Sequence, residues 1–127
     1  MTFIEVSDGE IIDKLSIIEV KLNKIQDQEK IKYILREYQY LKEVVVGKID
    51  FDIGDPLYTR LHKINYELWE IEDKIRSKEE QSVFDEEFVE LSRSIYILND
   101  ERARIKKEIN TQTKSRFVEQ KSHKTVY

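Results

Sequence analysis

Apolar side chains recur along four segments of this chain at alternating spacings of three and four residues. Such spacings place the side chains on one face of an α-helix, so each segment is predicted to be helical. We expect the segments to cover residues 7–25, 28–46, 56–76 and 82–110. Their apolar positions are Ile11, Leu15, Ile18, Leu22 and Ile25; Ile31, Ile34, Tyr38, Leu41 and Val45; Leu57, Leu61, Ile64, Leu68, Ile71 and Ile75; and Phe84, Phe88, Leu91, Ile95, Leu98, Ile105 and Ile109.

A polar residue that can cap a helix precedes each of these segments. The side-chain oxygen of such a residue accepts a hydrogen bond from a backbone N–H of the first turn. Gly47 is predicted to end the second helix, because glycine adopts the left-handed conformation easily. The predicted caps are Ser7 with Glu10, Asp27, Asp55 directly before the first-turn Pro56, and Ser82 with Asp85.

We call the line of apolar side chains along each helix its seam. The spacing of the residues in these seams predicts how the helices pack together. The seams repeat close to every 3.5 residues, which favours shallow, coiled-coil-like packing. The short connections favour antiparallel neighbours. We therefore predict an all-α protein, either an antiparallel four-helix bundle or paired helical hairpins, over residues 1–111, followed by a C-terminal tail, residues 112–127.

One position of the fourth seam carries a guanidinium group. Arg102 stands between Leu98 and Ile105, where the spacing calls for an apolar residue. In an up-down bundle with ~1.5 Å rise per residue, Asp13 lies ~8 Å, Asn65 ~14 Å and Arg102 ~12 Å from the same end. The three side chains are therefore predicted to meet at one level.

Further polar side chains next to the apolar seams are predicted to lie near these three residues, and together they form a candidate site. It is either a buried ion-pair network that fixes the register of the helices, a pocket for an anionic or hydroxyl-rich ligand, or a solvated face. The indole N–H of Trp69 is expected to find a polar partner there. The candidate residues are Asp13, Lys14, Asn65, Trp69, Glu72, Asn99 and Arg102, with Glu10, Arg76, Lys106 and Asn110 on the same polar lines.

Composition and charge agree with long helices and restrict the partners. Hydrophobic residues make up 39% and charged residues 38% of the chain, with three glycines and one proline. The net charge is −4, and residues 111–127 are basic, with four Lys or Arg against one Glu. We expect this tail to dock on the acidic body; its alternative is to reach a polyanion. Nucleic acid is therefore not the expected partner.

The chain offers no thiol and no sign of a membrane anchor. It has no cysteine, which excludes disulfides and thiol chemistry. Its N-terminal segment lacks a basic region and a long apolar core, and no apolar run approaches the ~20 residues that span a bilayer. We expect a soluble, cytoplasmic protein without a membrane partner.

Motifs for metal or cofactor chemistry are incomplete, so we expect no metal and no cofactor. The acidic elements fit a magnesium pyrophosphohydrolase only in reversed order, and no histidine has the E-x-x-H spacing of di-iron bundles. A calcium-like loop lacks its final glutamate. No serine elbow or phosphate-binding glycine loop is present. These motifs comprise Glu70, Asp73, Glu86, Glu87 and Glu90; His62 and His123; and Asp50, Asp52 and Asp55, with Leu61 at the glutamate position.

Four stretches, "VSDGEIIDKLSIIEVK", "INYELWEIEDKIRSKE", "FVELSRSIYILNDERARIKKEIN" and "VEQKSH", together resemble a small uncharacterised protein family of bacteria that also occurs in phages. The resemblance spans nearly the whole chain and is weakest over the second helix and the following loop. His123 and Gln120 depart from the expected aromatic residue and glutamate. The recurring polar positions would be Glu10, Asp13, Lys14, Glu19, Lys21, Asn65, Trp69, Glu72, Asp73, Arg76, Asn99, Asp100, Arg102, Lys107, Asn110, Glu119, Lys121 and Ser122.

The resemblance implies no established activity, only an association with genes of glycan or lipopolysaccharide biosynthesis and with glycosyltransferase modules. Three functional hypotheses follow. The first is a non-catalytic binding or adaptor protein that contacts a protein partner or a second copy through Tyr33, Tyr40 or Phe51. The second is an enzyme or sensor for a phosphorylated or nucleotide-sugar ligand, with Arg102 on the anion and Asp13 or Glu72 as base. The third is a phage or host regulator that binds nucleic acid through the tail.

Overall fold

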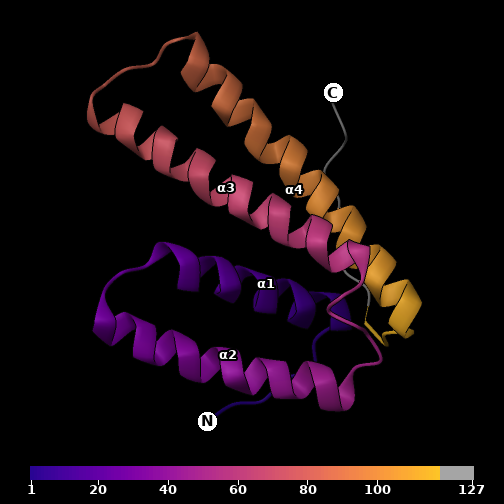
Figure 1. The fold of residues 1–127 in the computed structure, drawn as a ribbon. Helices are drawn as coiled ribbons and strands as arrows, with labels where there is room; N and C mark the ends of the chain where they lie inside the picture. Colours follow the sequence, from indigo (N-terminus) through magenta and orange to yellow (C-terminus); the bar gives the residue numbers. More distant parts are fainter. Residues whose placement is uncertain (118–127) are drawn as a thin grey trace.

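Four helices make up the computed structural model, which describes residues 1–117 (Figure 1). They are α1 (Asp8–Lys24), α2 (Gln28–Lys48), α3 (Pro56–Glu80) and α4 (Glu86–Thr113). The described part contains no strand, and the prediction of an all-α, four-helix fold is confirmed. None of the described helices is both long and apolar enough to cross a membrane.

The helices form two antiparallel hairpins, α1–α2 and α3–α4, and α1 lies between α2 and the second hairpin (Figure 1). α1 approaches the other three helices closely, whereas the only helix that α2 approaches within the described residues is α1. In Figure 1 the hairpins lie together where α1 begins and α4 ends, and they diverge toward the end of α1. The helices therefore surround α1 rather than a common central axis.

Three of the predicted helix caps are confirmed. The Ser7 hydroxyl accepts from the backbone N–H of Glu10 at 3.2 Å. Asp27 accepts from the first backbone N–H groups of α2. Asp55 accepts from the N–H of Leu57 at 2.8 Å, with proline as the first residue of α3. These contacts satisfy donors that a helix leaves unpaired at its start.

The other two predicted helix boundaries are wrong. Gly47 lies inside α2 and no glycine has a positive φ; the extended Ile49 ends this helix instead. Ser82 adopts a left-handed conformation with φ 56° in the preceding turn. Asp85 alone caps α4, accepting from the N–H of Phe88 at 2.9 Å. The seam pattern marks where side chains are buried, but it does not determine the backbone of these turns.

The hydrophobic core is centred on α1. Ile12 and Leu15 are fully buried there against residues of the other three helices. The connection between the hairpins adds Ile49 and Phe51 to this core. Phe51 is only 7% exposed, so its predicted role as an exposed contact residue is wrong. The alternation of apolar and polar residues through the connection allows its apolar side chains to reach the core while the aspartates face solvent.

The α3–α4 hairpin extends beyond the end of α1. The last residue of α1, Lys24, places its Nζ 3.4 Å from Oε2 of Glu70, and α3 continues from there to Glu80. The seam of α4 reflects this difference: Ile105 and Ile109 are fully buried, whereas Phe88, Leu91, Ile95 and Leu98 are only partly buried.

Candidate functional site

The first turn of α1 is fixed by residues at the end of α4. The N–H of Gly9 donates to Oδ1 of Asn110 at 2.7 Å, and the N–H of Asp8 donates to the Ser115 hydroxyl at 3.0 Å. A Cβ atom at Gly9 would lie 2.5 Å from the backbone oxygen of Lys106, so only glycine fits this contact. The Lys106 side chain pairs with Glu10 at 2.7 Å. α1 is thereby held at a fixed height along α4.

One turn further along α1, a buried carboxylate joins three helices. Asp13 is 1% exposed. Nε of Arg102 donates to its Oδ1 at 2.9 Å and Nη2 donates to its Oδ2, which is the two-pronged geometry that suits a guanidinium and a carboxylate. Nδ2 of Asn65 donates to Oδ1 at 3.0 Å. The carboxylate thus fixes the orientation of both partners.

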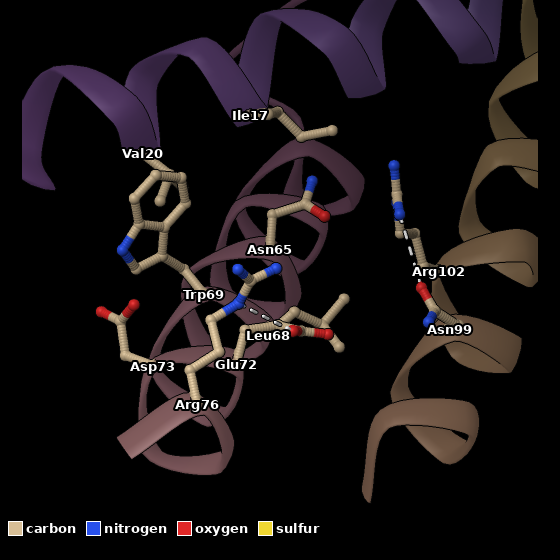
Figure 2. A pocket seen from close by; sticks show the side chains of 10 residues that line it. All are labelled: Ile17, Val20, Asn65, Leu68, Trp69, Glu72, Asp73, Arg76, Asn99 and Arg102. Carbon is tan, nitrogen blue, oxygen red and sulfur yellow. Dashed lines mark hydrogen bonds and ion pairs between the residues drawn. The ribbon is translucent and has the colours of Figure 1, made fainter. Parts of the chain in front are cut away.

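Asn65 links this ion pair to the space beside it. Its Nδ2 also donates to the Ser16 hydroxyl at 2.6 Å. A carboxylate only accepts hydrogen bonds, so the amide nitrogen must face Asp13 and the amide oxygen must face away. In Figure 2 this oxygen is turned toward the side of Arg102.

A cleft of about 560 Å³ opens beside these residues, where the two hairpins diverge (Figure 2). The side chain of Arg102 is 26% exposed, and its Nη1 lies 3.4 Å from Oδ1 of Asn99. The cleft is lined by Ile17 and Val20 of α1, by Asn65, Leu68, Trp69, Glu72, Asp73 and Arg76 of α3, and by Asn99 and Arg102 of α4.

The outer part of the cleft carries an indole and a second guanidinium. Trp69 is partly buried and lines the cleft. Nε of Arg76 lies 3.8 Å from Oε2 of Glu72, and the Arg76 side chain is 80% exposed. Asp73 adds a further carboxylate to the lining. Donors, acceptors and one aromatic ring therefore face the same space.

The ionic groups of the cleft largely balance one another. Arg102 is neutralised by Asp13, and Arg76 lies beside Glu72, which leaves the charge of Asp73 in excess. A cleft of this kind does not concentrate positive charge, so it does not favour a ligand with several negative charges. It can hold hydroxyl groups and one anionic group. To bind the anionic group, the guanidinium of Arg76 must release Glu72 and pair with the ligand instead.

Five of the seven candidate residues line the cleft, the buried Asp13 lies behind Asn65 and Arg102, and Lys14 lies elsewhere. Nζ of Lys14 lies 3.3 Å from Oε1 of Glu37, on the side of α1 that faces α2. Its place in the candidate site is wrong, because consecutive helical residues point about 100° apart. Sequence reasoning missed Ser16, Ile17 and Val20; Ser16 lies three residues after Asp13, which was the available signal.

Another polar group lies between α1 and α3, away from the cleft. Nε2 of His62 lies 3.6 Å from Oε2 of Glu19. The nearby Tyr58 hydroxyl is buried without a hydrogen bond of normal geometry, and burial raises the pKa of Tyr58 well above its ordinary value. Residues 1–117 contain no group of three His, Asp or Glu side chains placed to hold a metal ion.

Comparison with known proteins gives one match. The sequence model of a family described as a family of unknown function (DUF6165) matches residues 2–127. No curated protein and no solved structure matches the chain.

Proposed function

This chain belongs to the DUF6165 family of unknown function, and from its cleft we propose that it is a small helical binding protein for a hydroxyl-rich ligand with one anionic group. The observation that carries the proposal is the cleft between α1, α3 and α4. There, a guanidinium held in place by a buried carboxylate, an amide oxygen and an indole line one space of about 560 Å³. This volume is within the range of small-molecule sites.

Each lining group has a suitable counterpart on such a ligand. The indole of Trp69 offers a flat face for a ring. The amides of Asn65 and Asn99 supply acceptors and donors for hydroxyl groups. Arg76, the most exposed cation of the cleft, can bind a phosphate or carboxylate in two-pronged geometry. The ion pair between Asp13 and Arg102 keeps this side of the cleft in one conformation. Binding therefore costs less conformational entropy.

Binding without catalysis is better supported than an enzyme at this site. A general base must reach the proton that it removes. Both oxygens of Asp13 accept hydrogen bonds from Arg102, and Asn65 adds a third to this buried carboxylate. Glu72 lines the cleft and is the remaining candidate base of the enzyme alternative.

The biological setting is part of the proposal. We infer an accessory or adaptor role in glycan biosynthesis in a bacterium or phage, supported by the sequence resemblance and by a lining that suits sugar hydroxyls. The nucleic-acid alternative depends on the basic tail, of which residues 118–127 lie outside the described part. It therefore remains a prediction from sequence.

Thermal unfolding of the full chain tests the cleft. The probes are inorganic phosphate, glucose 1-phosphate, UDP and UDP-glucose, each with and without Mg²⁺. A ligand at a hundred times its Kd stabilises by about 2.7 kcal/mol, which raises Tm by several degrees. We expect glucose 1-phosphate, which joins one anionic group to a ring of hydroxyl groups, to raise Tm more than phosphate or the diphosphates do. Arg76→Ala should remove most of this shift, whereas Arg36→Ala, an exposed arginine of α2, should retain it.

Three results would count against the proposal. Equal shifts for Arg76→Ala and Arg36→Ala would place binding elsewhere. No shift with any probe would leave the cleft without the proposed ligand class. Product formation from UDP-glucose in the presence of Mg²⁺, followed by chromatography and lost in Glu72→Gln, would favour the enzyme alternative.

A further inference from the structure

The distal hairpin, defined here as residues 70–101, has no third helix over it. It begins at Glu70, the partner of the last residue of α1, and ends directly before Arg102, the partner of Asp13. The rest of the α3–α4 hairpin, which is α3 before Glu70 and α4 from Arg102 onward, is called the basal part. There, α1 lies against both α3 and α4. Beyond Lys24 the same side of α3 and α4 continues without α1 (Figure 1). Within the described part, the distal hairpin therefore lacks the cover that α1 gives to the basal part.

An apolar stripe of α4 lies on this uncovered side. Val89, Ser92, Tyr96 and Asn99 follow one another at spacings of three, four and three residues, so they share one side of the helix. Asn99 lines the cleft beside α1, so Ser92, seven residues earlier, shares the α1 side, and Val89 and Tyr96 lie toward its flank. Val89 is 51% exposed and Tyr96 38%, with the partly buried Phe88 beside them. This stripe continues the surface on which α1 packs.

The distal hairpin also concentrates the negative charge of the protein. It contains eleven Asp or Glu residues and four Lys or Arg residues, a net charge of −7 against −4 for the whole chain. Three of its four cations already pair with acidic neighbours of the same hairpin: Arg76 with Glu72, Lys78 with Asp85 and Glu87, and Arg93 with Glu90. Glu70 and Glu101 pair with Lys24 and Arg60 outside the hairpin, and the other acidic residues give the surface its excess charge.

We propose that the distal hairpin binds a basic amphipathic helix of another protein, placed along α3 and α4 as a continuation of α1. Its apolar side would contact the stripe of α4, and its lysines or arginines would face the acidic residues around it. The charge disfavours a second copy, because two surfaces of −7 would repel each other. It also disfavours nucleic acid and anionic lipid.

The chain itself supplies the structural template for this partner. α1 is an amphipathic helix that packs on α3 and α4 through buried aliphatic residues and adds ion pairs, Glu10 with Lys106 and Asp13 with Arg102. The proposed partner repeats this arrangement with the opposite charge. Val89 and Tyr96 are not part of the cleft lining, so variants of the stripe test this inference separately, although Glu72, Asp73, Arg76 and Asn99 belong to both the distal hairpin and the cleft.

A synthetic helix tests the proposal on the full-length protein. The probe is an amidated peptide of about 14 residues, ~21 Å long as a helix, with leucines at a and d positions and lysines elsewhere. A peptide of the same composition in scrambled order is the control probe. We expect saturable binding of the first peptide by calorimetry, and at least about tenfold weaker binding of the second, equivalent to roughly 1.4 kcal/mol.

Two matched pairs of variants locate the contact. Val89→Glu should weaken binding at least about tenfold, whereas Val46→Glu, the same change at a 73%-exposed valine of α2, should leave it within about twofold. Glu86→Lys should weaken binding, and Glu29→Lys should not; both glutamates lie in the first turn of a helix, of α4 and α2 respectively. Circular dichroism checks that each variant retains its helical content.

Several outcomes would overturn the inference. The absence of saturable binding, equal affinity for the scrambled peptide, or equal effects within either pair of variants would show that no amphipathic helix is recognised here. If light scattering found a dimer that Val89→Glu dissociates, a second copy would be the occupant instead. If Val89→Glu loses helical content, the Glu86→Lys pair decides the location.

Discussion

The basal and distal parts of the α3–α4 hairpin are built on the same heptad seam but bury it to different extents. In the basal part, α1 covers the seam and Leu61 and Ile109 are completely buried. In the distal part, Leu91 and Ile95 occupy equivalent seam positions and remain partly buried. The difference arises from the third helix rather than from the seam residues themselves.

The comparison also separates two kinds of polar interaction. Near the base, polar groups are buried and joined across helices, as in the contact between Asp13 and Arg102. At the distal end, ion pairs such as Lys78 with Asp85 and Arg93 with Glu90 involve at least one exposed residue and lie within the turn or a single helix. Buried networks are costly to break, whereas exposed pairs contribute little. We therefore expect stability to depend mainly on the base and binding specificity mainly on the distal end.

The largest expected difference is between two leucines. Leu15→Ala removes a completely buried side chain at the centre of the base and should cost about 3 kcal/mol in the free energy of unfolding. Leu91→Ala removes a partly buried side chain of the distal seam and should cost about 1 kcal/mol. Urea denaturation measures both values. Equal losses would show that the distal seam is covered as fully as the basal one.

Substitution of two glycines by alanine should give smaller changes in the free energy of unfolding, with opposite signs at the two positions. Gly9→Ala places a methyl group 2.5 Å from the Lys106 backbone oxygen and should destabilise the protein by about 2 kcal/mol. Gly47→Ala meets nothing within 4 Å inside α2, and should stabilise by about 0.5 kcal/mol because alanine favours the helix. Thermal unfolding compares the two variants. A neutral Gly9→Ala would contradict the tight contact between α1 and α4.

The smallest expected effect is the response of the distal turn to pH. The hydrogen bond from the backbone N–H of Phe88, together with Lys78, lowers the pKa of Asp85. A carboxyl group with a lowered pKa stabilises the folded state above its ordinary pKa of about 3.9, and this contribution disappears as the pH falls through the folded-state value. The amide resonance of Phe88 should therefore titrate with a midpoint below about 3.9.

Two variants check the assignment of this titration. Asp85→Asn retains a good helix cap and should abolish the titration of the Phe88 resonance. Lys78→Met should move the midpoint upward, since it removes the cation that stabilises the ionised carboxylate. A midpoint at or above the ordinary aspartate value in the native chain would contradict the proposed contacts.

Much of the fold could be predicted from the sequence because its local signals agree with its packing. The seams identified four helices, three caps were located correctly, and the rise per residue brought Asp13, Asn65 and Arg102 to one level. A pocket at this level was one of three alternatives, and the sequence could not choose among them, because the cleft depends on the angle at which the hairpins diverge. A linear pattern of apolar positions contains no information about that angle.

The errors have related physical causes. The pattern assigned α1 one apolar face, but α1 has helices on several sides, so Ile12, Ser16 and Val20 are also buried. Lys14 was assigned to the site by its proximity in sequence to Asp13, although it points toward α2. Phe51 was predicted to be an exposed contact residue, yet its alternating neighbours allow it to reach the core.

The contact between Gly9 and Asn110 joins residues 101 positions apart. During translation, α1 therefore lacks this contact until Asn110 has left the ribosome. The α1–α2 hairpin is made first, and Ile12 and Leu15 are fully covered only after α3 and α4 have followed. Formation of this contact thus depends on the closure of a long loop.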